Sequence, residues 1–353
     1  SDGVLDGTGE NGRWGGYNYI YRMQAFQDNR HLAVLGNFRG NITIPTVGGG
    51  HTTLTNRKNG NYDGFLIKLD TTASPMRAAW AVAPEQFAGG RSYFRNVATT
   101  AAGHVIISNY IRPGRSYQGR LIKVNGNTGA TVWVKGPYAD AYYIYGAATI
   151  GEDIFFGAEH RTAGVTPFEN GVTIPTASGS VSKLDAAGNY QWTVPLPSSY
   201  RADEIVSSPS GDAIFVYGPT PSSSSRKAAS GTGACAVTGQ NKAVLYRLNP
   251  ADGSCVWAKD IGPMGYGRMT ADATYLYGVG YEDEPITFDQ DLTLRSRGPE
   301  NDATLLKWRT SDGMGMWGMS IGGTGDDYGY DVALTSAGGI VIGGYTTSDS
   351  IDL

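Results

Sequence analysis

The chain has few charged residues, and this scarcity excludes several classes of protein. Asp, Glu, Lys and Arg together make up 17% of the 353 residues, and the net charge is -4, whereas an ordinary soluble protein has about 25% charged residues. A weakly acidic chain cannot neutralise many phosphates, so we expect no nucleic-acid partner. Long apolar runs are also missing. None approaches the roughly 20 residues of a membrane-spanning helix, so we expect no membrane insertion.

Catalytic motifs are missing too. The four histidines do not form a His-Glu-x-x-His zinc pattern, and the sequence has neither a Walker phosphate loop nor a Gly-x-Ser-x-Gly elbow. We therefore predict no catalytic residue and no bound cofactor. The one metal candidate is Ca²⁺, which oxygen-rich loops can hold, although the acidic residues here lack EF-hand spacing. These residues are Glu282, Asp283, Glu284, Asp289, Asp291, Asp326 and Asp327.

In contrast, Gly (51 residues), Tyr (22) and Trp (7) are abundant, and many of them belong to a repeated hairpin. Each copy has a short strand centred on Lys or Arg, a tight turn that contains Gly, and a Trp four residues after that Gly. Asn, Asp and Gly supply the backbone angles that such turns require. The Gly and Trp pairs are Gly129 and Trp133, Gly188 and Trp192, Gly253 and Trp257, and Gly313 and Trp317, and Trp80 marks a first copy that lacks the Gly.

A second repeated unit precedes each hairpin. It consists of a strand that begins with Tyr, a small turn and a strongly apolar strand, such as residues 105–107 or 340–342. No segment has a sustained helical period. Four short strands in every ~50–65 residues are typical of a β-propeller, so we predict an all-β fold of four-stranded antiparallel blades. The basic residues at the centre of the hairpin strands are expected to be solvated or to pair between blades; they are Lys68, Lys123, Lys183, Arg247 and Lys307.

The number of blades follows from the number of repeats. Six Tyr-led units are present but only five Trp hairpins, and we predict six blades, with seven as the alternative, in a single domain of residues 1–353. Residues 4–9 resemble residues 319–325 at the end of a hairpin, so the N-terminus would complete the last blade. The predicted blades are 17–90, 91–140, 141–198, 199–264, 265–325, and 326–353 together with 1–16.

Two features resemble known propeller repeats. Residues 321–334 (IGGTGDDYGYDVAL) and 339–345 (GIVIGGY) resemble the bacterial SBBP β-propeller repeat. The Gly-x-x-x-Trp hairpins are similar to the quinoprotein-like propeller repeat, in which the Trp docks one blade on the next. The resemblance covers nearly the whole chain, and it implies a propeller in an extracellular setting rather than a particular chemistry.

The two cysteines support the same setting. Cys235 and Cys255 bracket the third strand of the fourth predicted blade, and we expect a disulfide between them, with two buried thiols as the alternative. A disulfide is typical of an oxidising compartment, so we expect a secreted or cell-surface protein with a processed N-terminus. Asn41 begins the sequence Asn-Ile-Thr, which is a candidate N-glycosylation site.

The starts of the Tyr-led strands form the candidate binding site. In a propeller these starts share one face with the loops between the second and third strands, which are long and dissimilar here, and variable loops on a rigid scaffold commonly bind ligands. Together these tyrosines would form a circle at the mouth of the propeller's central channel, where they could stack on a sugar or bind a peptide. Alternatively, the tyrosines pack between blades. The candidate residues are Tyr19, Tyr93, Tyr143, Tyr200, Tyr266 and Tyr328, with Arg22, Arg95, Arg201 and Arg268 nearby.

The sequence therefore predicts a non-enzymatic structural, assembly or adhesion module. It would bind other protein subunits, including copies of itself, or surface glycans through the face that carries the long loops. The alternative is a sialidase-like glycosidase that acts at the central channel. Residues 310–317 contain the Asp and Trp of the sialidase Asp-box, but Met314 stands where that motif needs Gly, and this difference favours the binding module.

Overall fold

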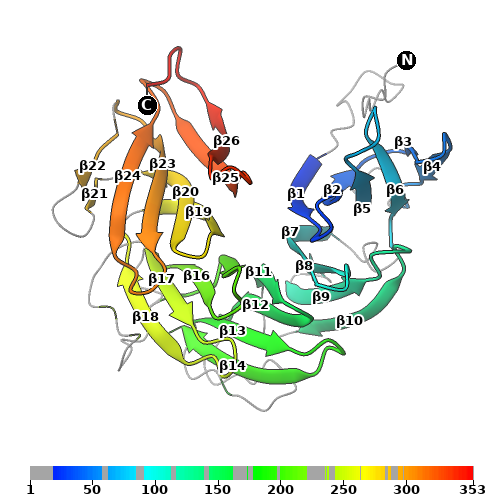
Figure 1. Ribbon diagram of the computed structural model, residues 1–353, viewed down its shortest axis with the longest axis horizontal. Coiled ribbons are helices and arrows are strands. Elements are labelled where there is room, and N and C mark those ends of the chain that lie inside the picture. Colours follow the sequence, from blue (N-terminus) through cyan, green and yellow to red (C-terminus); the bar gives the residue numbers. More distant parts are fainter. Residues whose placement is uncertain are drawn as a thin grey trace. The chain divides into compact units, whose positions relative to one another are not determined.

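The computed structural model describes most of the chain, and the account below concerns those residues. The described residues are 19–57, 63–84, 91–112, 117–138, 143–161, 173, 178–196, 199–220, 235, 237, 243–262, 264–282, 285–287, 293–296 and 298–352. They form β-strands joined by turns and loops (Figure 1). None of them belongs to a helix that is long and apolar enough to cross a membrane.

Five four-stranded sheets follow one another along the chain, and each is a propeller blade. The first has the order β1 (Tyr19–Ala25), β2 (His31–Phe38), β5 (Asp63–Asp70), β6 (Arg77–Val82). The second contains β7 (Arg91–Thr99), β8 (Val105–Arg112), β9 (Gln118–Val124) and β10 (Thr131–Tyr138). The third contains β11 (Tyr143–Ile150), β12 (Asp153–Glu159), β13 (Gly179–Leu184) and β14 (Tyr190–Leu196).

The last two blades have the same order of strands. The fourth contains β15 (Glu204–Ser207), β16 (Ile214–Pro219), β17 (Ala243–Leu248) and β18 (Cys255–Asp260), and the fifth contains β19 (Met264–Ala271), β20 (Tyr275–Glu282), β23 (Asp302–Arg309) and β24 (Gly315–Ile321). Neighbouring strands pair antiparallel in the first, second, fourth and fifth blades. The prediction of an all-β propeller with four-stranded antiparallel blades is therefore confirmed.

Three small sheets accompany the blades. Two are hairpins in the loops between second and third strands: β3 (Ile42–Pro45) with β4 (His51–Leu54), and β21 (Ile286–Thr287) with β22 (Thr293–Leu294). The third is β25 (Asp327–Leu334) with β26 (Ile340–Thr346), after which Asp352 bridges back to Gly322.

The prediction of six blades, with seven as the alternative, is wrong, because the described residues form five. The sixth Tyr-led unit forms only the two-stranded sheet β25–β26. The prediction of six blades follows the number of Tyr-led units. A blade also needs a hairpin centred on Lys or Arg, and residues 326–352 contain none. Residues 1–16, which we expected to complete this sheet, lie outside the described part of the chain.

The chain divides into two compact units. Unit 1 comprises Ser1–Ile154 and Leu184–Asn189, and unit 2 comprises Phe155–Lys183 and Tyr190–Leu353. The first two blades lie in unit 1 and the last two in unit 2. Apolar side chains between adjacent blades form the core of each unit. In unit 1 the buried side chains of Leu35 and Leu66 belong to the same cluster as those of Val97 and Ile107.

The Trp hairpins connect successive blades within a unit. In unit 1 the Trp80 indole Nε1 donates to the Gly126 carbonyl oxygen at 2.9 Å, and Lys68 Nζ donates to the same oxygen at 3.1 Å. In unit 2 the Trp257 Nε1 likewise donates to the Thr310 carbonyl oxygen at 3.1 Å. The Trp of one blade thus binds the hairpin turn of the next.

The turn glycines are required by this contact. Gly129 has a φ of +74°, and a Cβ atom there would lie 3.1 Å from the Trp80 ring. Any other residue would be strained at this φ and would also push the turn away from the indole. The basic residues add a second connection, since Lys123 Nζ donates to the Ala186 carbonyl oxygen at 3.0 Å. The expected pairing of basic residues between blades is confirmed at Lys68 and Lys123.

Candidate functional site

The register of the sheets places the Tyr-led strand starts beside the long loops. Tyr19 lies opposite Asn37, Tyr93 opposite Tyr110, and Tyr328 opposite Tyr345. The second member of each pair lies one or two residues before the end of the second strand of its sheet, from which the long loops of the blades leave. Tyr266 lies in β19. The side chains of Tyr19, Tyr93 and Tyr266 are outside the described part of the structure. The predicted circle of tyrosines can therefore be examined only at Tyr143, Tyr200 and Tyr328.

A second set of tyrosines, which our sequence reasoning missed, ends the second strands. In four of the repeats a Tyr comes one to three residues after the apolar run, and this was the available signal. The residues are Tyr110, Tyr217, Tyr281 and Tyr345. Tyr217 is a core residue: its hydroxyl donates to the Met264 carbonyl oxygen at 2.7 Å, and burial raises its pKa. The other three contact or neighbour the predicted tyrosines.

In unit 1, Tyr143 packs between the second and third blades. Its ring centre lies 4.4 Å from that of the buried Tyr110 and 5.1 Å from that of Tyr117. Arg95 Nη2 donates to the Tyr110 hydroxyl at 3.0 Å, and its guanidinium carbon lies 5.1 Å from the centre of the Tyr145 ring. This cluster has the close contacts expected of tyrosines that pack between blades.

The four predicted arginines do not have one common role. Arg22 is buried and its Nε donates to the carbonyl oxygen of Arg95 at 3.3 Å, and both belong to unit 1. In unit 2, Arg201 forms an ion pair with Asp203 at 2.6 Å, and Arg268 forms one with Glu204 at 2.8 Å. The last two guanidinium groups therefore hold carboxylates of the protein itself.

Tyr200 lies beside this ion-paired group. Its backbone N–H donates to the Pro219 carbonyl oxygen at 3.2 Å, which places it at the end of β16. The Arg201 guanidinium carbon lies 4.8 Å from the centre of its ring. Tyr200 lies four residues before β15 rather than at its start, and it is held by a cation–π contact with the next residue along the chain.

Three tyrosines of the β25–β26 sheet form an arrangement that we call the tyrosine ladder: Tyr328, Tyr330 and Tyr345. The ring of Tyr328 is within 4° of parallel to that of Tyr330 and within 25° of parallel to that of Tyr345, with centres 6.2 and 6.5 Å apart. Tyr330 and Tyr345 are each 54% exposed. Tyr328 is half-buried and packs edge-to-face on Tyr281 of the fifth blade, 4.9 Å between centres.

Polar groups hold the centre of the ladder in place. The Tyr328 hydroxyl donates to Asp326 Oδ1 at 3.0 Å and accepts from Asn301 Nδ2 at 3.2 Å. The hydrogen bond to the Asp326 carboxylate raises the pKa of Tyr328. The Asn301 amide also donates to Asp326 and lowers the pKa of that carboxyl group. Asp326 is thus an ionised acceptor bonded to Tyr328, the tyrosine with which the two exposed rings stack.

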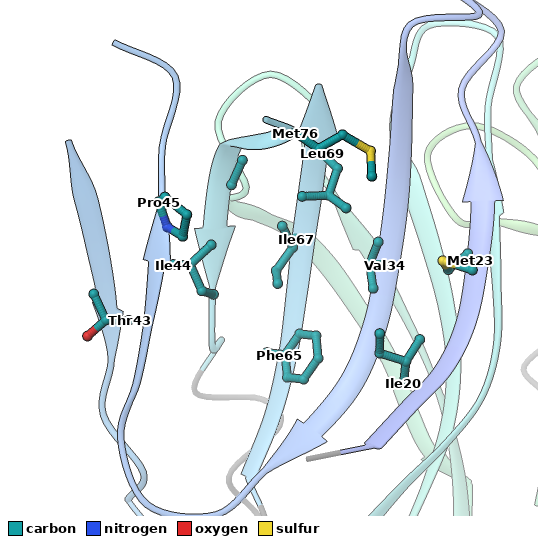
Figure 2. A pocket seen from close by; sticks show the side chains of 11 residues that line it. Ile20, Met23, Val34, Thr43, Ile44, Pro45, Phe65, Ile67, Leu69 and Met76 are labelled. Carbon is teal, nitrogen blue, oxygen red and sulfur yellow. The ribbon is translucent and has the colours of Figure 1, made fainter. Parts of the chain in front are cut away.

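An apolar cavity lies on one face of the first blade (Figure 2). It has a volume of about 220 Å³. Side chains of β1, β2 and β5 form its floor, and Ile44 and Pro45 of β3 form one side. Thr43 is the one polar residue among those that line it. Because it offers so few hydrogen-bonding groups, this cavity cannot orient a polar substrate.

The remaining predictions concern a metal site, a glycosylation site and a disulfide. Within the described ranges, no group of three or more His, Cys, Asp or Glu is arranged to hold a metal ion. Four of the seven acidic residues that we considered for Ca²⁺ lie outside those ranges: Asp283, Glu284, Asp289 and Asp291. Asn41 is exposed just before β3. The predicted disulfide between Cys235 and Cys255 is confirmed, with Cα atoms 5.9 Å apart.

Comparisons with known proteins add little to this description. No protein-family model matches the sequence, and no curated protein matches it. Thus neither the SBBP-like nor the quinoprotein-like resemblance is supported at the level of a family.

Solved structures with a similar arrangement of strands do exist. A quinohemoprotein alcohol dehydrogenase from Pseudomonas putida HK5 has a TM-score of 0.38 and 14% identity over 80% of this chain, which spans 40% of that protein. The WD40 domain of Neurospora crassa Pan2 has a TM-score of 0.47 and 9% identity, covering 92% of this chain and 85% of that domain. The Dos1 propeller has a TM-score of 0.42 and 10% identity, covering 92% and 75%. Because these three TM-scores are below 0.5, the fold assignment here depends on strand order and register alone.

Proposed function

We propose that this protein is a non-enzymatic, extracellular or cell-surface β-propeller that binds surface glycans in an adhesive role. The observation that supports the proposal is the tyrosine ladder, in which Tyr330 and Tyr345 are each 54% exposed and stack with Tyr328, whose hydroxyl bonds both Asn301 and Asp326. Flat aromatic faces stack on the C–H faces of sugars, and nearby amide and carboxylate groups accept and donate hydrogen bonds to hydroxyls.

The carboxylates beside Tyr200 and Tyr328 favour binding over hydrolysis. A glycosidase uses two carboxyl groups about 5–9.5 Å apart, one of which must donate a proton. Near Tyr200, both Asp203 and Glu204 are engaged by arginines, and Asp326 is kept ionised by its neighbours. These carboxylates are suited to holding a ligand or a side chain. The glycosidase alternative is tested in the same experiment.

The test is binding to an array of neutral and acidic oligosaccharides, followed by calorimetric titration of the best-bound soluble oligosaccharide. Tyr330→Ala and Tyr345→Ala should each weaken binding about tenfold, or roughly 1.4 kcal/mol, because each removes one stacking face. Tyr330→Phe keeps the face and should bind as the unmodified protein does. Val256→Ala, at an exposed position of β18, is the matched control.

Three results would contradict the proposal. If no oligosaccharide on the array binds, the proposed glycan ligand is wrong. If both alanine variants keep full affinity, the tyrosine ladder is not the binding site. Release of reducing sugar from a bound oligosaccharide would establish the glycosidase in place of the binding module.

A further inference from the structure

Two positions of the tyrosine ladder recur in the second blade. There the start of β7 pairs with Tyr110, as Tyr328 at the start of β25 pairs with Tyr345. In both sheets the register then shifts, and one residue of the first strand is left as a bulge without an opposite partner. This residue is Arg95 in the second blade and Tyr330 in β25. Tyr330 thus has the position of Arg95, and Tyr345 has that of Tyr110.

In the second blade, the bulged residue supplies a cation to an aromatic ring. The Arg95 guanidinium carbon lies 5.1 Å from the centre of the Tyr110 ring, and Arg95 Nη2 donates to the Tyr110 hydroxyl at 3.0 Å. The negative face of an aromatic ring attracts a cation at such a distance. The ring of Tyr110 therefore has a cation from the protein itself, and it is only 5% exposed.

Other tyrosines of the chain also have a cation over the ring. The Arg201 guanidinium carbon lies 4.8 Å from the centre of the Tyr200 ring, and Lys307 Nζ lies 3.6 Å from that of Tyr275. The ladder differs, because its bulged residue is a further aromatic ring. Among the described residues, no Lys or Arg lies over any of the three ladder rings.

The charge near the ladder also favours a cation. Residues 310–353 contain six Asp and no Lys, Arg or His, whereas the whole chain has a net charge of -4. Asp326 accepts from the Tyr328 hydroxyl, and its pKa lies below the usual value because Asn301 donates to it. An ionised carboxylate and the exposed faces of aromatic rings attract a positive group and repel a negative one.

We propose that the ladder selects glycans that carry free, protonated amino groups, as oligomers of glucosamine do. The inference rests on the proposed glycan function and names the sugar chemistry that the site prefers. The ammonium group would lie against the rings of Tyr330 and Tyr345, in the role that the Arg95 guanidinium has on Tyr110. Acetylation of the amine removes this charge, and a sugar carboxylate has the opposite charge, so both kinds of glycan should bind less tightly.

Two oligosaccharides that differ in this charge provide the test. Calorimetric titration compares a hexamer of β-1,4-linked glucosamine with its fully N-acetylated form, in a weakly acidic buffer in which the amines are protonated. The glucosamine hexamer should bind about tenfold more tightly, as expected for one cation–π contact together with a nearby carboxylate. High salt should reduce this preference, because it screens the attraction.

Three variants connect the preference to the ladder. Tyr330→Arg introduces the arginine of the second blade, whose guanidinium should occupy the site, so the preference should be lost. Tyr21 is the bulged residue of the first blade and is 42% exposed, so Tyr21→Arg makes the same change elsewhere and should keep the preference. Asp326→Asn retains an acceptor for Tyr328 without the charge, and it should weaken binding of the glucosamine hexamer but not of the N-acetylated one. Urea denaturation checks that each variant is folded.

The outcomes separate this inference from the proposed function. Equal affinity for the two hexamers, tighter binding of the N-acetylated form, or an unchanged preference in both Tyr330→Arg and Asp326→Asn would overturn this inference alone. Loss of the preference in Tyr21→Arg would also overturn it, because the preference would then reflect the net charge of the chain. If neither hexamer binds but another oligosaccharide does, the proposed function stands and this inference is wrong. If no oligosaccharide binds, both are wrong.

Discussion

At the scale of single residues, glycine has two distinct roles that share one backbone angle. Gly313 has a φ of +70°, and a Cβ atom there would lie 2.9 Å from the Trp257 ring and 2.8 Å from Lys259 Cγ. Gly338 has a φ of +80°, but a Cβ atom there would meet nothing within 4 Å. The first position therefore needs Gly for both conformation and space, and the second for conformation alone.

This difference gives a prediction for a matched pair of variants. Gly338→Ala should lower the free energy of unfolding by about 1 kcal/mol, the usual cost of a left-handed residue other than Gly. Gly313→Ala should lower it by about 1–3 kcal/mol more, because the turn must also move away from Trp257. Urea denaturation measures both. Equal losses would show that the Trp contact does not restrict the turn.

At the scale of elements, the unit of assembly is a hairpin and the turn that it binds. Lys68 in β5 and Trp80 in β6 are cross-strand neighbours, and both side chains donate to the buried carbonyl oxygen of Gly126 in the next blade. Two donors from adjacent strands thus converge on one acceptor. Their contributions to stability should depend on one another.

We expect this dependence in a double-mutant cycle. Lys68→Met and Trp80→Phe should each cost about 1 kcal/mol, because the remaining donor still bonds the carbonyl oxygen. The double variant should cost roughly 1 kcal/mol more than the sum, because the buried oxygen then has no donor. Urea denaturation of the four proteins measures the coupling. Simple additivity would mean that the two bonds act independently.

The sequence predicted these elements well where the signal is local. Asn, Asp and Gly in the turns and Trp in the fourth strand identified the hairpins because backbone angle and steric fit depend on neighbouring residues. The tyrosines at the ends of the second strands were missed because each acquires its role only from a partner across the sheet, as Tyr345 does from Tyr328. The sequence located Tyr328 but could not indicate that Tyr330 would align with it.

At the scale of the whole molecule, the disulfide bears on where the protein is found. Cys235 and Cys255 are 20 residues apart in sequence, and the bond connects the loop after β16 to the start of β18. A bond of this kind is typical of secreted proteins and supports the proposed extracellular or cell-surface location.

Removal of this bond gives the last prediction. A Cys235→Ser, Cys255→Ser double variant should lose about 3 kcal/mol of stability, as expected for closing a loop of about 20 residues. Protein isolated without reductant should show no free thiol by titration, and dithiothreitol should lower its urea midpoint to that of the variant. Two titratable thiols in the isolated protein would contradict the bond and the proposed location.

The sequence by itself determined the strands, the hairpins and the propeller class, because each depends on local backbone preference or on a pattern that recurs along the chain. Only the tertiary structure decided that there are five blades and which tyrosines meet. Both depend on pairing between segments that are distant in sequence. The apolar triplet of β26 is the clearest case: its residues have the pattern of a buried central strand, yet Val341 is 55% exposed, because burial depends on a strand from a distant part of the sequence.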